Sequence, residues 1–186
     1  MADLRTIYRT EIRKKMRELF GYPNDLAVPE IKKVTVNAGV GAMKDSPELE
    51  KNVIADLTKI IGQKPRVRKT KKSISGFKLR AGQVVGAAVT LRGKRMYDFI
   101  EKLVKVVLPR LRDFHGLSEK GLDGRGNFSI GISEQTIFPE IRPDEAKENF
   151  GLQVSITTSA KDNEQGKKLL ELLGLPFQKI NNQETR

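Results

Sequence analysis

The sequence predicts an α+β fold, in which a mostly antiparallel sheet carries helices on one face and leaves the other face open. Segments with helical and strand periodicity follow one another without regular strand–helix alternation, which argues against a parallel sheet. The strand segments place apolar side chains on one side and polar or basic ones on the other, as expected of a half-buried sheet. A chain of 186 residues can bury a core of its own, so we expect a single domain over residues 1–179.

The first helix is predicted over residues 4–20, where apolar residues recur at helical spacing and Gly21 follows as a stop. Its opposite side is basic, and we interpret that side as a solvated face. Residues 33–38 then alternate as a strand. The apolar side chains of this strand lie on one side, and its polar side chains share the other: Lys33, Thr35 and Asn37.

A second helix is predicted to open near Pro47, because Asp45 and Glu48 have the spacing of a capping box, and to close at Gly62. The basic stretch 64–72 contains β-branched residues and is typical of a short strand that leads into a flexible loop. Residues 83–92 alternate again as a strand. Its second side carries Gly86, Ala88, Thr90 and Arg92, of which the first two leave the backbone open to a flat partner.

The C-terminal half follows the same logic. A helix over residues 96–107 is predicted to end at Pro109. Two strands, at 128–132 and 153–158, flank an irregular segment at 134–149. A leucine-rich helix then ends at Gly174, and the polar tail over 180–186 is expected to be disordered.

The net charge of +12 is concentrated in one part of the chain. The 41 residues from Leu57 to Tyr97 hold twelve Lys and Arg and no Asp or Glu, while the remainder has 23 charges of each sign. Clustering of one sign costs self-repulsion unless a polyanion relieves it. An anionic membrane would require a basic amphipathic helix, which the strand-like stretch 64–72 is not. We therefore predict a nucleic-acid partner and no membrane.

Several function classes are excluded or unsupported. The chain has no Cys and a single His, so thiolate metal sites and cysteine nucleophiles are excluded. His115 follows Asp113, but a lone His beside a glycine turn is more often structural. The glycines after the first strand lack the third glycine of a dinucleotide fingerprint, because position 44 is Lys44. We expect no enzyme activity and no cofactor, and the absence of an apolar leader or long apolar run predicts a cytoplasmic protein.

One acidic cluster raises the question of a magnesium site, but its spacing is interrupted by Pro139 and Pro143. Without a fixed geometry we expect a solvated or protein-contacting patch, and no metal. The cluster consists of Glu134, Glu140, Asp144, Glu145 and Glu148.

The sharpest local signal is the loop 71–82, in which Phe77 stands among cations and glycines. Such a loop can follow a phosphate backbone while its tip packs on a sugar or base. An ordinary hairpin whose Phe77 returns to the core is the alternative. Two other classes of function remain open. One is a general RNA chaperone or nucleoid-type binder, which would show no preference among nucleic acids; the other is a small metabolic enzyme, for which the sequence offers no convergent set of polar groups.

Several stretches, taken in order, resemble the universal large-subunit ribosomal protein five family, the bacterial protein that binds 5S ribosomal RNA (rRNA). They cover about residues 1–179. The matching stretches are Gly62–Pro65, Lys71–Ser75, Phe77–Arg80, Leu108–Phe114, Asp123–Asn127, Glu134–Ile141 and Leu172–Phe177.

The resemblance implies a structural, non-enzymatic role in the large ribosomal subunit and a fold like an RNA-recognition module. It points to Lys33, Asn37, Gln63 and Thr90 as 5S rRNA contacts, and the strand alternation adds Thr35 and Arg92. With the basic strand included, the predicted 5S rRNA site is Lys33, Thr35, Asn37, Gln63, Lys64, Arg66, Thr90 and Arg92.

The resemblance also implies further partners. The loop that would contact the elbow of peptidyl-site tRNA is Ser73, Ile74, Ser75, Gly76, Phe77, Lys78, Leu79 and Arg80. Residues 110–148 would face the small subunit, where small-subunit protein thirteen completes an intersubunit bridge. The remaining expected partners are 23S rRNA and the neighbouring large-subunit proteins of the central protuberance.

Overall fold

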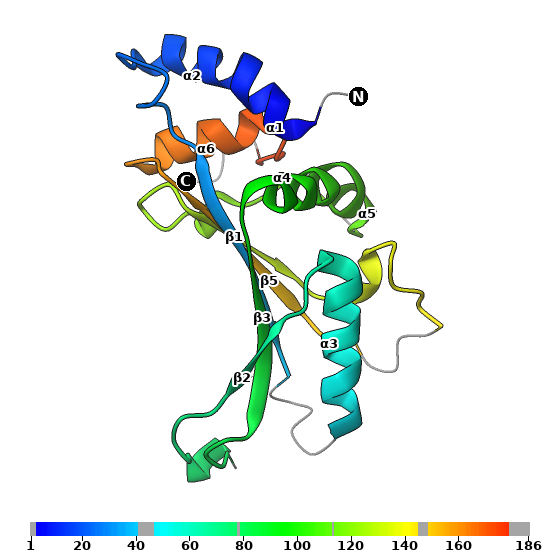
Figure 1. Ribbon diagram of the computed structural model, residues 1–186. Helices are drawn as coiled ribbons and strands as arrows, with labels where there is room; N and C mark the ends of the chain where they lie inside the picture. Colours follow the sequence, from blue (N-terminus) through cyan, green and yellow to red (C-terminus); the bar gives the residue numbers. More distant parts are fainter. Residues whose placement is uncertain (1–2, 41–46, 78, 113, 145–148, 179–186) are drawn as a thin grey trace, which may run out of the picture. The chain divides into compact units, whose positions relative to one another are not determined.

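The computed structural model describes residues 3–40, 47–77, 79–112, 114–144 and 149–178. Their strands form a five-stranded sheet in the order β2-β3-β1-β5-β4 (Figure 1), and the predicted α+β class is confirmed. The strands are β1 (Ile31–Gly39), β2 (Arg66–Lys69), β3 (Val84–Leu91), β4 (Phe128–Ile132) and β5 (Leu152–Thr158).

The chain divides into two compact units. The first unit comprises Met1–Lys32, Gly93–Ile130 and Ile156–Arg186, and the second comprises Lys33–Arg92 and Gly131–Ser155. The single domain over residues 1–179 stays a prediction, and the tail over 180–186 lies outside the described residues.

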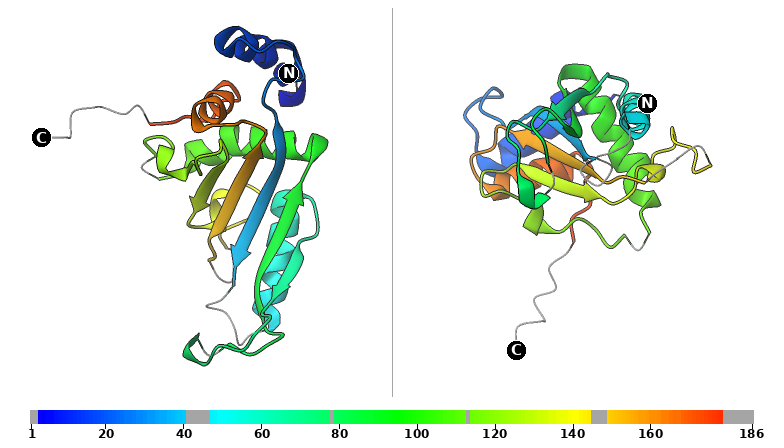
Figure 2. Two further views of the ribbon diagram at one scale, coloured as in Figure 1. Left: turned by 90° about the vertical axis from the view of Figure 1, so that its left-hand side faces the viewer. Right: turned by 90° about the horizontal axis from the view of Figure 1, so that it is seen from below.

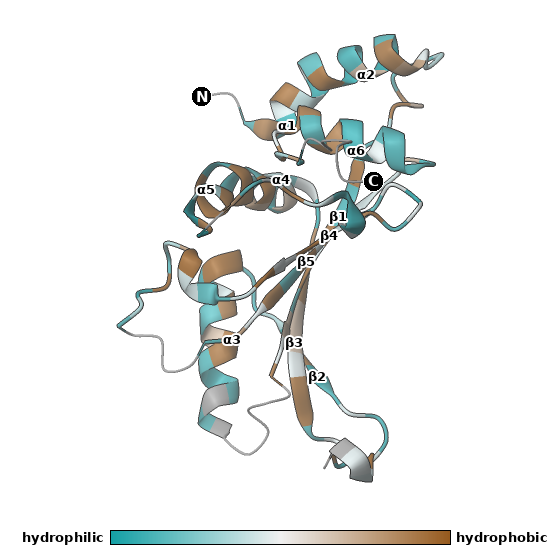
Figure 3. Ribbon diagram, turned by 180° about the vertical axis from the view of Figure 1, so that it is seen from behind, coloured by the Kyte–Doolittle hydropathy of each residue, from teal (hydrophilic) through white to brown (hydrophobic). Residues whose placement is uncertain are grey.

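In the second unit, α3 (Pro47–Ile61) packs its apolar stripe against the sheet. Val53, Leu57, Ile60 and Ile61 are buried, and Gly62 ends the helix with a φ of 70°. Figure 2 shows α3 behind the strands and, among the described residues of this unit, no helix over their other side. Figure 3 shows polar and apolar segments alternating along α3. Asp45, the predicted cap of this helix, lies outside the described residues.

In the first unit, the N-terminal helix is continuous but not uniform. It consists of α1 (Leu4–Ile7), the π-helical turn η1 (Tyr8–Ile12) and α2 (Arg13–Phe20), and Gly21 ends it in the left-handed conformation. The buried Tyr8 hydroxyl donates a hydrogen bond to the Pro29 carbonyl at 2.9 Å. Its ring lies 6.1 Å from that of Tyr97, whose pKa burial raises to about 12.

The helix after β3 extends further than predicted. It comprises α4 (Gly93–Lys102), the π-helical turn η4 (Leu103–Val107) and α5 (Leu108–Arg110), so it begins three residues before position 96 and ends one residue after Pro109. Pro109 has no backbone N–H to donate within the helix, and the helix ends at the next residue, Arg110. The last helix, α6 (Asn163–Leu172), begins at the cap Asp162 and is followed by Gly174, as predicted.

Candidate nucleic-acid interface

The exposed side of the sheet in the second unit brings neutral hydrogen-bonding side chains from two strands together. β1 pairs antiparallel with β3, which places Thr35 opposite Thr90 and Asn37 opposite Ala88. Residues directly opposite each other share a face, with Cβ atoms about 4.5–5.5 Å apart. Asn37 and Thr90 are exposed, whereas the valines of β1 that alternate with Thr35 and Asn37 are buried. The predicted alternation is therefore confirmed for β1. In β3, of the residues predicted on the open side, Thr90 is exposed but Gly86 and Ala88 are buried.

β2 adds two cations to the same face. Its antiparallel pairing with β3 places Arg66 opposite Ala88 and Arg68 opposite Gly86, so Arg66, Ala88 and Asn37 form one row across three strands. Both arginines are exposed, and neither side chain has a partner among the described residues. Two residues apart on one strand, they stand about 7 Å from each other along the chain. Arg68, which is not among the predicted site residues, also belongs to this face.

The other predicted residues lie at the margins of this face. Lys33 lies next to Val34 on β1, and Arg92 directly follows Leu91, the residue that pairs with Val34. Lys33 is half-buried and Arg92 is exposed. Arg92 already interacts within the chain. Gln63, half-buried, and Lys64, exposed, connect α3 to β2. We name these eight predicted residues together with Arg68 the basic face.

The electrostatics of the basic face have one sign. None of the five strands contains Asp or Glu, so no carboxylate on a strand offsets the cations. A polyanion would gain favourable contacts along this surface without repulsion from the strands themselves.

Gly86, in the middle of the face, is required by the close packing of β3 against β1. A Cβ at this position would lie 2.7 Å from the Ala38 carbonyl oxygen on β1. Gly86 and Ala88, which were predicted to leave the backbone open to a flat partner, are both buried. The close contact between β3 and β1 requires glycine at position 86 even without a partner.

We expect Gly86→Ala to lower the free energy of unfolding by about 1–3 kcal/mol, because the backbone of two paired strands must separate. Urea unfolding measures this change. Gly39→Ala is the matched control, since Gly39 lies directly opposite Gly86 and a Cβ there would meet nothing within 4 Å. Equal effects of the two substitutions would contradict the packing explanation.

The loop between β2 and β3, predicted to be flexible, is closed by hydrogen bonds of its own. Ile74 and Leu79 exchange backbone hydrogen bonds of 2.9 and 3.1 Å, and the Ala81 N–H donates to Ser73 Oγ at 3.0 Å. Thr70 closes the base through backbone bonds with Gly82 and Gln83. We name residues 70–83 the hairpin. Its tip includes the short helix η3 (Ser75–Phe77) and the half-exposed Ile74. Lys78 and the side chain of Phe77 lie outside the description.

The acidic segment is anchored by a buried glutamine. Gln135, which is fully buried in η6 (Gln135–Ile137), accepts a hydrogen bond from the Phe150 N–H at 2.8 Å through its Oε1. Phe138 and Ile141 are also buried. Glu134, Glu140 and Asp144 are exposed, while Glu145 and Glu148 lie outside the described residues. The described residues include no group of three or more acidic or His side chains placed to hold a metal ion.

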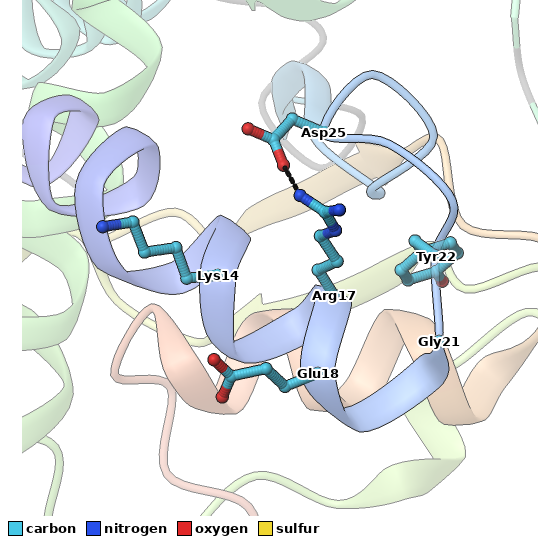
Figure 4. Close-up of a pocket in the computed structure, with 6 residues that line it drawn as sticks. All are labelled: Lys14, Arg17, Glu18, Gly21, Tyr22 and Asp25. Atoms are coloured by element: carbon cyan, nitrogen blue, oxygen red, sulfur yellow. Dashed lines mark hydrogen bonds and ion pairs between the residues drawn. The ribbon is translucent and has the colours of Figure 1, made fainter.

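Two further features, His115 and a pocket at the end of α2, form no catalytic constellation with the described residues around them. His115 is exposed, and its neighbour Asp113 lies outside the described residues. A pocket of about 540 Å³ at the end of α2 is lined by charges of both signs and by Tyr22 (Figure 4). Across it, Arg17 Nη1 and Asp25 Oδ1 lie 3.3 Å apart. None of the predicted site residues lines this pocket.

Comparisons with known proteins decide the family. A family model for "Ribosomal protein L5" matches residues 24–80, and a model for the C-terminus of the same ribosomal family matches residues 84–177. The chain belongs to the ribosomal L5 family. It is 49% identical over 177 residues to large ribosomal subunit protein uL5 of Natranaerobius thermophilus, which covers 95% of this chain and 99% of the relative.

Other members of the family are similar over the same extent. Large ribosomal subunit protein uL5 of Halothermothrix orenii is 48% identical over 95% of this chain and 99% of its own. The protein of that name from Desulfatibacillum aliphaticivorans is 49% identical over 96% of this chain and all of its own. Membership of the L5 family confirms the resemblance and makes the chain a structural, non-enzymatic ribosomal protein of the large subunit. None of the helices in the described ranges has the length and apolarity that crossing a membrane requires.

Proposed function

We propose that this L5-family protein binds 5S rRNA through the basic face. The observation that carries the proposal is the strand register, which places Arg66 in a row with Asn37, and Arg68 in a row with Gly86, on a surface without strand carboxylates. The strands are rigid through their paired backbones, so these side chains keep fixed spacings. A surface of this kind fits the shape of one RNA backbone better than another.

The two kinds of side chain have different roles in this proposal. The cations neutralise phosphates, which releases counterions and makes affinity fall steeply with salt. Asn37 and Thr90 add hydrogen bonds to phosphate or sugar oxygens, which set the register of the protein on the RNA. Affinity is therefore dominated by the cations, and preference for 5S rRNA by the neutral donors.

An equilibrium titration tests the proposal. The purified protein is titrated with 5S rRNA and with an unrelated RNA of the same length, at two salt concentrations. Binding to 5S rRNA that survives the higher salt, while the control RNA is lost, supports a shape-specific site. If both RNAs bind equally and both lose their affinity at the higher salt, the protein is a general polycation such as an RNA chaperone.

The hairpin supports a second contact, with the elbow of peptidyl-site tRNA. Its base is closed by the bonds of Thr70, and its tip presents the half-exposed Ile74 beside cationic residues. An aliphatic tip on an ordered basic hairpin can pack on a ribose while its cations face the phosphates.

Deleting residues 73–81 is expected to leave 5S rRNA affinity at the wild-type level and to impair translation. The deletion retains Thr70 and its partners Gly82 and Gln83, so the ends of β2 and β3 can still pair. The affinity comes from the titration above, and translation is measured with ribosomes that contain the variant. Loss of 5S rRNA binding would instead place the hairpin in the primary RNA site.

The remaining proposed contacts concern the subunit interface. The buried Gln135 and Phe138 hold the acidic segment in place, and they leave Glu134 and Asp144 facing solvent. An anchored acidic surface is complementary to a basic protein, which supports small-subunit protein thirteen as the partner in an intersubunit bridge. Contacts with 23S rRNA and the other proteins of the central protuberance complete the proposed assembly.

A further inference from the structure

The turn Asp123–Asn127, in the first unit, is closed by one carboxylate. Asp123 Oδ1 accepts hydrogen bonds from the backbone N–H groups of Arg125 at 2.8 Å and Asn127 at 3.1 Å. Asp123 Oδ2 accepts from Asn127 Nδ2 at 2.6 Å. This side-chain bond, with the backbone bonds, lowers the pKa of Asp123 below its usual value. The carboxylate of Asp123 thus closes the turn.

The same turn is fastened to two distant segments. Thr158, at the end of β5, donates from Oγ1 to the Gly126 carbonyl at 2.8 Å and from its N–H to Asn127 Oδ1 at 3.0 Å. The Gly126 N–H donates to Asn163 Oδ1 at the start of α6, at 3.1 Å. Figure 1 shows this loop beside the first turn of α6. The backbone of the turn therefore has little freedom to move.

Of the three residues of the turn that are not glycine, only Arg125 makes no described hydrogen bond through its side chain. It is exposed, and within the described part of the chain its guanidinium meets no acceptor. A Cβ on the neighbouring Gly124 would meet nothing within 4 Å, so the space beside it is open. Lys161 is also exposed and without a described partner, and it follows Ala160, against which Gly126 packs.

We propose that Arg125, held outward by this turn, binds an RNA phosphate, with Lys161 as a neighbouring cation. A guanidinium presents a planar fork that binds phosphate through two parallel hydrogen bonds, and a rigid backbone reduces the entropy lost on binding. Protein interfaces centre on large apolar anchors. The large exposed apolar residues among those described are Leu19, Leu26 and Ile74, none of which belongs to these loops.

This inference rests on family membership and not on the basic face. The residues of that face all lie between positions 33 and 92, in the second unit, whereas Arg125 and Lys161 belong to the first. Two RNAs could supply the phosphate, 5S rRNA and 23S rRNA, and the experiment separates them.

The test compares wild type with Arg125→Ala in separate titrations of 5S rRNA and 23S rRNA over a range of salt. We expect about tenfold weaker binding in one of the two titrations, the loss of one charge-assisted contact. The slope of log K against log salt should become shallower there by roughly 0.7–0.9. Arg125→Lys should retain the slope and lose part of the affinity, because an ammonium keeps the charge without the fork.

Arg9→Ala is the matched control, since Arg9 is an exposed arginine of the same unit whose removal changes the net charge equally. Unchanged affinity and slope with both RNAs for Arg125→Ala would overturn the proposal, as would an equal loss for Arg9→Ala. If Arg125→Ala binds both RNAs normally but fails to retain a neighbouring protein in isolated subunits, the arginine is a protein contact and the proposal is wrong. Asn37→Ala and Thr90→Ala test the basic face independently of these results.

Discussion

Replacing Arg66 and Arg68 together with alanine is expected to weaken binding to 5S rRNA about a hundredfold, at roughly 1.4 kcal/mol for each charge-assisted contact. Their guanidinium groups are exposed on one face of β2 and have no described partner within the chain. The substitutions therefore remove contacts with RNA without breaking a described contact inside the protein. Because both are proposed to neutralise phosphates, the salt dependence should become shallower by roughly 0.7–0.9 for each. Binding to an unrelated RNA should fall as well, since a phosphate contact carries no sequence information.

The neutral donors should behave differently on the same surface. Asn37→Ala and Thr90→Ala are each expected to cost about 1 kcal/mol in 5S rRNA affinity, the net value of one hydrogen bond. The salt slope should not change, and the unrelated RNA should bind as before, so preference falls without loss of electrostatic attraction. Wild-type affinity in both variants would show that another surface binds 5S rRNA.

The control for the arginine pair is Lys71→Ala with Lys72→Ala. These lysines are exposed, belong to the same acid-free part of the sequence and change the net charge equally, but they follow β2 rather than lie on the basic face. If this pair weakens 5S rRNA binding as much as the arginine pair, total charge and not position determines the affinity. The comparison is made by titration after circular dichroism has shown that each variant is folded.

Gly166→Ala is expected to destabilise the protein by about 3 kcal/mol or more. This is the opposite of the usual effect in a helix interior, where alanine is more favourable than glycine by about 1 kcal/mol. Gly166 is buried in α6, and a Cβ there would lie 2.4 Å from Gly126 Cα and 2.5 Å from its carbonyl oxygen. Both neighbours are backbone atoms of the turn that Asp123 closes. Relief of the collision must therefore displace either the helix or a turn that three hydrogen bonds fasten in place.

Urea unfolding of Gly166→Ala and Gly131→Ala measures the effect. Gly131 lies on β4 with open space around its Cβ position, so its replacement should change stability by less than about 1 kcal/mol. A helix-stabilising effect of Gly166→Ala would contradict the close contact with Gly126.

The π-helical turn in the N-terminal helix has a signal in the sequence. Leu4, Tyr8, Ile12 and Met16 are spaced by four, and all are buried. In an α-helix with 3.6 residues per turn, each step of four overshoots the previous residue by about 40°, so three steps leave the buried face. The wider π-helical turn at Tyr8–Ile12 takes up this excess. The same spacing accompanies the π-helical turn at Leu103–Val107, where Phe99 precedes it.

The sequence by itself determined the class of fold, the alternation of β1, the concentration of positive charge and the family. These properties depend on local periodicity and composition, which neighbouring residues express without reference to the rest of the chain. Only the tertiary structure decided that Arg68 shares a row with Gly86, and that Gly126 packs on Gly166 forty positions away. Strand register and contacts between distant backbones depend on how segments meet in space, and no local pattern in one sequence specifies that meeting. For the same reason Arg125, unremarkable among 35 basic residues, became a candidate RNA contact only when the structure showed what holds it in place.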